Sequence, residues 1–230
     1  ENMQPWFLGI NPRGLVPVLV DDGAVHIESN DIIQYLERKF TAPKLIPAGH
    51  ENELATLLRH EDDLHLDLRT LSFRFVFAPP GPPKPAAALD SYIKNGAGTV
   101  RGVKDPEKDV QVEFWQRAAR EGFTDERARA SAQKFRAEFD ALDRTLATQP
   151  YLMGAELSVL DIAWFIYEHR LSLGGYPFAR LHPHVHAWAE KLRAKPEFAK
   201  EVGQLRHSPE QLDAVHRAQA GKTLEMVAGF

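Results

Sequence analysis

Two kinds of hydrophobic pattern follow each other along the chain, and the change comes near residue 41. Before it, residues 16–20 (VPVLV) form an apolar run that predicts a strand. Residues 21–24 (DDGA) predict a tight turn, because aspartate and glycine tolerate the positive φ angles of hairpins. Residues 25–27 (VHI) predict a short return strand. Ser29 then predicts the cap of a helix, since apolar positions spaced by three and four give that helix one buried face.

After residue 50 the spacing is helical almost to the end. Apolar residues step by three and four through residues 51–76, which predicts one long helix packed lengthwise against others. Glu61 interrupts this apolar seam, and we interpret it as part of a solvated face or a domain contact. Residues 78–85 (APPGPPKP) cannot be helical, because proline lacks the amide donor. We interpret residues 41–50 as a linker.

Ser158 and Asp161 have the spacing of a helix capping box, with Leu157 and Ile162 at the positions of a hydrophobic staple. The apolar run behind it, residues 163–167 (AWFIY), predicts the central helix of a helical domain. We therefore assign Ser158 and Asp161 a structural role and no catalytic one.

The proline in the first strand predicts a binding site for an extended peptide. Because Pro17 cannot donate to a sheet ladder, we expect a cis Val16–Pro17 bond that exposes the amide and carbonyl of Val16. An extended ligand can pair with such a backbone. Further on, Ser29 opens a helix whose free amides suit a carboxylate, and Glu28 supplies an acceptor for an amine. These four residues together predict a site for a short peptide with an α-amino acid head.

The segments that carry these residues, 11–19 (NPRGLVPVL) and 28–36 (ESNDIIQYL), resemble the glutathione-binding half of glutathione transferases. The capping box and residues 182–188 (HPHVHAW) are similar to parts of the family's helical domain. The resemblance implies a thioredoxin-like α/β N-terminal domain, incomplete in this chain, and an all-α C-terminal helical domain. The implied boundaries are residues 1–40 for the first domain, 41–50 for the linker and 51–230 for the second.

The resemblance also implies roles for single residues. Val16 and Pro17 would hold the cysteinyl backbone of glutathione, and Glu28 and Ser29 its γ-glutamyl head. The family's opening β-α-β segment, which carries the Tyr, Ser or Cys that activates the thiol, has no counterpart here. No catalytic residue is therefore assigned, and we expect it upstream of this chain.

Three further departures concern the pocket and the helical domain. Leu15 stands where many members of the family have a Lys or Gln that contacts a carboxylate of glutathione. The segment 78–124 is longer than in a minimal member of the family and loosely resembles bacterial members that cleave aryl ethers. The tail at 207–230 extends past the usual end of the family.

Three residues near the end of the predicted long helix have two possible roles. They either border the electrophile pocket or anchor the proline-rich crossing: Phe73, Arg74 and Phe77.

The implied function is that of a glutathione transferase, which conjugates glutathione as co-substrate to small, mostly apolar electrophiles in detoxification. One alternative is a glutathione-dependent lyase that cleaves aryl ethers or carbon–halogen bonds. Another is a non-catalytic module for dimerisation or ligand binding. We expect a homodimer, because the seam of residues 54–75 is long and the family's corresponding helix lines a two-fold interface.

Charge and composition argue against several kinds of partner and site. The net charge of −4 gives no basic excess for nucleic acid or anionic membranes. The absence of cysteine excludes disulfides and Cys-ligated zinc. We expect no metal site at His182, His184 and His186, because Pro183 predicts a helix start, where alternate residues diverge. No apolar run approaches the roughly 18 residues that span a bilayer and no secretory signal is evident, so we expect a cytoplasmic protein without membrane or nucleic-acid partners.

Overall fold

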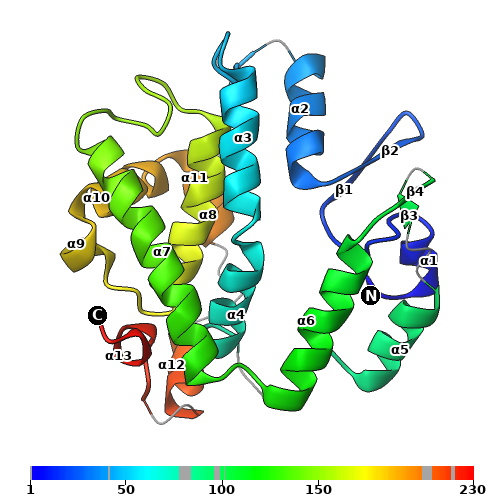
Figure 1. Cartoon of the computed structure of the whole chain (residues 1–230). Helices are drawn as coiled ribbons and strands as arrows, with labels where there is room; N and C mark the ends of the chain where they lie inside the picture. The colour runs from blue at the N-terminus through cyan, green and yellow to red at the C-terminus, as the bar shows by residue number, and fades with distance from the viewer. Residues whose placement is uncertain are drawn as a thin grey trace. The chain divides into compact units, whose positions relative to one another are not determined.

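The computed structural model describes residues 2–40, 42–77, 84–95, 99–100, 102–203, 209–218 and 221–230. They form two compact units, each discontinuous in sequence (Figure 1). Unit 1 combines Glu1–Pro43 with Pro80–Gly122, and unit 2 combines Lys44–Pro79 with Phe123–Phe230. Most of the proline-rich crossing lies outside the described residues. The domain boundaries at residues 1–40, 41–50 and 51–230 stay a prediction.

A β-hairpin and a helix form the N-terminal half of unit 1. Strand β1 (Val18–Asp21) pairs antiparallel with β2 (Ala24–Ile27), and Val18 lies opposite Ile27. The turn residues Asp22 and Gly23 have φ angles of 49° and 80°, the left-handed conformation that a two-residue hairpin loop requires. The predicted hairpin is thus confirmed, although its first strand begins two residues later. Helix α2 (Ser29–Lys39) follows, contacts both strands and buries Ile32.

The second half of unit 1 packs against its first residues. It consists of α5 (Ala86–Asn95), the short antiparallel strands β3 (Thr99–Val100) and β4 (Val103–Lys104), and α6 (Glu107–Glu121). Helix α5 contacts α6 and also α1 (Pro5–Leu8). Tyr92 of α5 is fully buried, and its hydroxyl donates a hydrogen bond of 2.8 Å to the carbonyl of Arg13.

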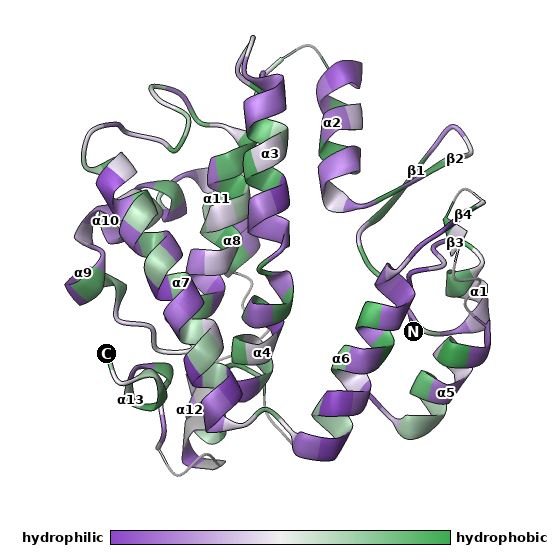
Figure 2. Cartoon of the chain, in the orientation of Figure 1, coloured by the Kyte–Doolittle hydropathy of each residue, from purple (hydrophilic) through white to green (hydrophobic). Residues whose placement is uncertain are grey.

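Unit 2 is built from helices in the part of the chain that the structure describes. Helix α7 contacts α4, α10 and α13, while α8 contacts α3, α4 and α10. The long helices mix apolar and charged residues along their length, as the alternating colours of α7 show (Figure 2). The helices are α3 (Glu51–Asp62), α4 (His65–Phe75), α7 (Asp125–Leu146), α8 (Val159–Leu173), α9 (Phe178–Leu181), α10 (Pro183–Arg193), α11 (Pro196–Gly203), α12 (Pro209–Ala218) and α13 (Leu224–Ala228).

The long helix predicted over residues 51–76 is two helices. Helix α3 ends at Asp62, α4 begins at His65, and the amide of Leu64 bonds to the carbonyl of Glu61 at 3.0 Å. The hydroxyl of Tyr167 in α8 donates to that same carbonyl at 3.0 Å. A side chain that takes a carbonyl out of the helical ladder is a known cause of kinks. Glu61 itself is only 7% exposed, so its placement on a solvated face was wrong, and the alternative of a domain contact stays a prediction.

The apolar seam of α3 and α4 is covered inside unit 2. Leu54, Leu58, Leu71 and Phe75 are each at most 2% exposed, and the two helices contact α7 and α8. The seam therefore does not require a second copy of the chain, and the homodimer stays a prediction that rests on the family alone.

The capping box at the start of α8 is confirmed. Both Ser158 and Asp161 are fully buried, and the amide of Ser158 donates to the Asp161 carboxylate at 2.9 Å. The same carboxylate accepts from the backbone amide of Leu152 at 2.9 Å and from the indole of Trp188 at 3.0 Å. The predicted central helix is confirmed as well, because Leu160, Trp164, Phe165 and Leu171 all belong to the core.

The described residues hold neither a membrane-spanning helix nor a metal-binding cluster. They contain no helix long and apolar enough to cross a membrane. Nor do they contain a group of three or more His, Cys, Asp or Glu side chains that could hold a metal ion.

Candidate functional site

The loop before the hairpin is held by its own side chains. Asn11 is 1% exposed, and its amide group donates to the carbonyl of Leu15 at 2.8 Å and accepts from the amide of Arg13 at 3.0 Å. Gly14 has a φ of 64°, and a Cβ there would lie 3.1 Å from a ring carbon of Tyr92. Only glycine fits this position without strain. The loop therefore presents the residues that follow it in a defined place.

Val16 and Pro17 lie at the open end of the hairpin. The bond between them is cis, as predicted, and Val16 is 70% exposed. Within the described residues, the amide and carbonyl of Val16 have no hydrogen-bond partner. Because Val18 pairs with Ile27, the adjoining residues Pro17 and Glu28 both lie at the open end of the hairpin. An extended ligand can therefore reach the Val16 backbone and the start of α2 at the same end of the hairpin.

Glu28 and Ser29 open α2, which begins one position earlier than expected. Glu28 is the N-cap residue, with a φ of 69° and no side-chain capping bond, and Ser29 is the first helical residue. The expectation that Ser29 caps the helix was therefore wrong by one residue. Ser29 is exposed, and the first-turn amides of α2 have no partner within the helix. Such a helix end suits an anion.

Glu28 is paired with Arg13. One guanidinium nitrogen of Arg13 lies 2.8 Å from Oε1 of Glu28, and two others contact Asp105 at 2.6 and 2.9 Å. The hydrogen bonds that Arg13 donates to Asp105, and next the one that it donates to Glu28, raise the pKa of Arg13 above its ordinary value against the effect of burial.

Sequence reasoning missed this cluster. Arg13 was noted only as part of a motif, and Asp105 lies 92 residues further along the chain. The one local feature that marks Asp105 is its position before Pro106 and α6, where its carboxylate accepts a hydrogen bond from the amide of Glu107 at 3.4 Å.

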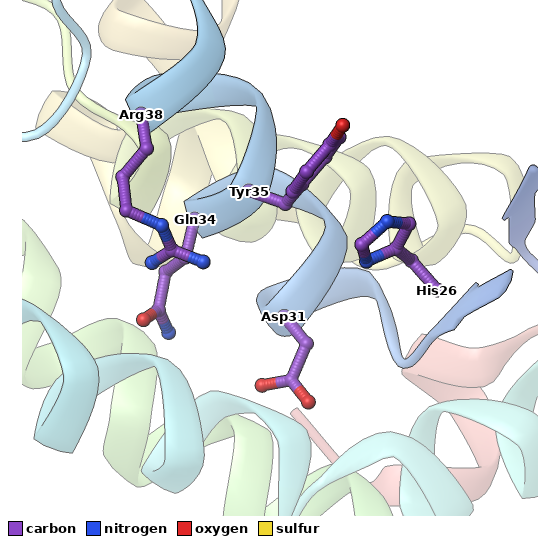
Figure 3. Close-up of a pocket in the computed structure, with 5 residues that line it drawn as sticks. All are labelled: His26, Asp31, Gln34, Tyr35 and Arg38. Carbon is purple, nitrogen blue, oxygen red and sulfur yellow. The ribbon is translucent and has the colours of Figure 1, made fainter. Parts of the chain in front are cut away.

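Residues of β2 and α2 line a polar pocket of about 250 Å³ (Figure 3). The imidazole of His26 stacks on the ring of Tyr35 with centroids 3.9 Å apart, and the Tyr35 hydroxyl donates to Asp21. None of the four predicted residues lines it, so this pocket is separate from the predicted peptide site. Its lining is His26, Asp31, Gln34, Tyr35 and Arg38.

Phe73 and its neighbours form an aromatic cluster in unit 2. Phe73 stacks on Phe123 with centroids 5.4 Å apart, and Phe77 lies beneath the guanidinium of Arg170 at 5.4 Å. Both interpretations of residues 73, 74 and 77 stay predictions, because these contacts suit a pocket wall and an anchor equally.

Comparison with known proteins gives consistent matches along the chain. Residues 1–39 match the model of the glutathione S-transferase N-terminal domain, and residues 118–191 match that of the C-terminal domain. Protein LigF of Sphingobium sp. strain SYK-6 is 28% identical over 206 residues, which are 85% of this chain and 76% of that protein.

Two further similarities come from a plant protein and a solved structure. The probable glutathione S-transferase GSTF1 of Oryza sativa is 27% identical over 205 residues, or 87% of this chain and 78% of that protein. The crystal structure of the β-etherase LigF from Sphingobium superposes with a TM-score of 0.70 at 27% identity, covering 89% of this chain and 84% of that one.

Proposed function

The chain belongs to the glutathione S-transferase superfamily, and we propose from this premise that it binds glutathione and transfers it to a small electrophile. The predicted family and fold class are confirmed by the two domain matches and the structural neighbours. One observation carries the proposal: the Val16 backbone, which has no partner among the described residues, and the N-terminus of α2 lie at the same end of one hairpin.

The γ-glutamyl head and the cysteinyl unit of glutathione each have matching groups at this end of unit 1. The α-carboxylate of the γ-glutamyl head would accept from Ser29 and from the first amides of α2. The ammonium group would donate to Glu28, and the cysteinyl backbone would pair with the amide and carbonyl of Val16 beside Pro17. The thiolate then attacks an electrophilic carbon, so that a carbon–sulfur bond forms and the leaving group departs with its electron pair. Holding both reactants together is the protein's contribution in this scheme.

A second candidate is a glutathione-dependent lyase. It is favoured by the similarity to LigF, whose structure is that of a β-etherase. In such a reaction the thiolate attacks the carbon that bears the ether oxygen, the carbon–oxygen bond breaks, and a phenolate leaves. The two candidates share the glutathione site and differ in the second substrate.

We also propose a homodimer, because the superfamily commonly dimerises. The cytoplasmic location stays a prediction.

The test is calorimetric titration of glutathione into the wild type, Ser29→Ala and a control, Thr56→Ala, which removes an exposed hydroxyl from α3 in the other unit. Loss of a hydrogen bond to a charged group costs about 1.5–3 kcal/mol, so Ser29→Ala should weaken binding about tenfold or more. Equal affinity in all three proteins would contradict the site.

Turnover with a chloronitroarene and with an aryl ether then separates the two activities, because one releases chloride and the other a phenol. A full-length protein that binds glutathione but turns over neither substrate would favour the non-catalytic alternative.

A further inference from the structure

Asp105 is the residue that places Arg13 and, through it, Glu28. Arg13 uses Nε and Nη2 for a two-pronged contact with Asp105, at 2.6 and 2.9 Å, and Nη1 for Glu28 at 2.8 Å. Such two-pronged pairs fix the plane of the guanidinium as well as its position. Rotation of Arg13 away from Asp105 would therefore also break its contact with Glu28.

Low solvent exposure restricts the movement of the Asp105 and Arg13 side chains. The side chain of Asp105 is 8% exposed and that of Arg13 is 22% exposed, while Glu28 is the most open of the three at 33%. The backbone of Arg13 is held separately, because its carbonyl accepts from the buried hydroxyl of Tyr92. Both anchors come from the segment 80–122, which is the half of unit 1 that follows α4 in sequence.

The charges leave Glu28 able to hold a cation. Two carboxylates face one guanidinium, so the cluster keeps one excess negative charge at neutral pH. Within the described part of the chain, Arg13 is the only partner of the Glu28 carboxylate, and it contacts Oε1. The other oxygen is therefore available to an ammonium group. Without Asp105, the Arg13–Glu28 pair would be neutral and its attraction for a cation weaker.

We propose that Asp105 is a positioning residue for the amine of the γ-glutamyl head, acting through Arg13 on Glu28. This inference rests on the proposed function, because it assigns a role within the same glutathione site. Asp105 does not touch the ligand in this scheme. It sets the orientation of Arg13 and the net charge of the cluster.

The experiment measures two affinities for each protein. One ligand is glutathione, and the other is its deaminated analogue, in which a glutaryl group replaces the γ-glutamyl group. The wild type should prefer glutathione, and Asp105→Asn should reduce that preference about tenfold while the affinity for the analogue stays nearly constant. A purely structural role would lower both affinities together. The matched control is Asp109→Asn, an exposed aspartate in the first turn of α6, which should behave as the wild type.

A second variant covers the case in which Asp105→Asn does not fold. Arg13→Lys keeps the charge but loses the two-pronged geometry, and it should also reduce the preference for glutathione by at least about threefold. A wild type that binds neither ligand overturns the proposed function and this inference with it. A wild type that prefers glutathione, with the same preference in the folded variants, overturns this inference and leaves the proposed function intact.

Discussion

Replacement of Asp161 by alanine should destabilise unit 2 strongly without touching the glutathione site. The carboxylate is fully buried and accepts four hydrogen bonds, from the amides of Leu152 and Ser158, the hydroxyl of Ser158 and the indole of Trp188. A single hydrogen bond to a charged group contributes about 1.5–3 kcal/mol. Because neighbouring bonds do not add fully, we expect Asp161→Ala to lower the free energy of unfolding by about 4–6 kcal/mol.

Asparagine at this position separates the two halves of the network. The bonds from Leu152 and Trp188 reach Oδ1, whereas both bonds from Ser158 reach Oδ2. An amide can keep the first pair, but its NH2 group then faces the two donors of Ser158. Asp161→Asn should therefore lose about half as much as alanine, roughly 2–3 kcal/mol. Ser158→Ala, which removes one bond and the cap, should lose about 0.5–2 kcal/mol.

The assay is urea unfolding followed by circular dichroism and tryptophan fluorescence, with Asp213→Ala as an exposed control in unit 2. The expected order of urea midpoints is control, Ser158→Ala, Asp161→Asn, Asp161→Ala, from highest to lowest. Glutathione affinity measured below the transition should be unchanged in every variant that is folded. An Asp161→Ala protein with a normal midpoint, or one that is stable but has lost glutathione, would refute the structural assignment.

Two further predictions concern pH and assembly. Burial, and to a lesser extent the charge of Asp62, raises the pKa of Glu61 from 4.5 to about 7. Since the folded state then holds the proton more tightly, the contribution of Glu61 to the free energy of unfolding should fall by up to about 3 kcal/mol as pH rises from about 4.5 to 7. Urea midpoints at pH 5 and pH 8 for the wild type and Glu61→Gln isolate this contribution, because burial also shifts the pKa values of Glu168 and His169, which titrate in both proteins; an equal pH dependence in both proteins would contradict the prediction. Light scattering at micromolar concentration should give the mass of a dimer, and a clean monomer would reject the homodimer.

Local signals were readable from the sequence, and contacts between distant residues were not. The Asp22–Gly23 turn and the Ser158–Asp161 box each depend on residues within a few positions of one another, so short-range backbone chemistry was enough to predict them. The break between α3 and α4 has no such local pattern, and the hydroxyl that bonds to the Glu61 carbonyl at the break belongs to Tyr167, 106 residues away.

In the candidate site, too, local features could be predicted from the sequence and contacts between distant residues could not. The exposed, cis-linked Val16 and the helix start at residues 28–29 followed from turn and capping chemistry. The left-handed conformation of Glu28 moved the helix start by one residue, and its partnership with Arg13 and Asp105 depends on tertiary packing. A regular pattern of hydrophobic residues carries no information about which distant carboxylate an arginine will contact.

The split of unit 1 into two stretches of sequence limits how this protein can be recombined with its relatives. A chimera that exchanges only Glu1–Pro43 would take Arg13 and Gly14 from one parent, and Tyr92 and Asp105, which they contact, from the other. Functional hybrids should therefore exchange both stretches of unit 1 together and leave the helices between them unchanged. The same division orders events on the ribosome, since α3 and α4 emerge before the α5–α6 half that completes unit 1.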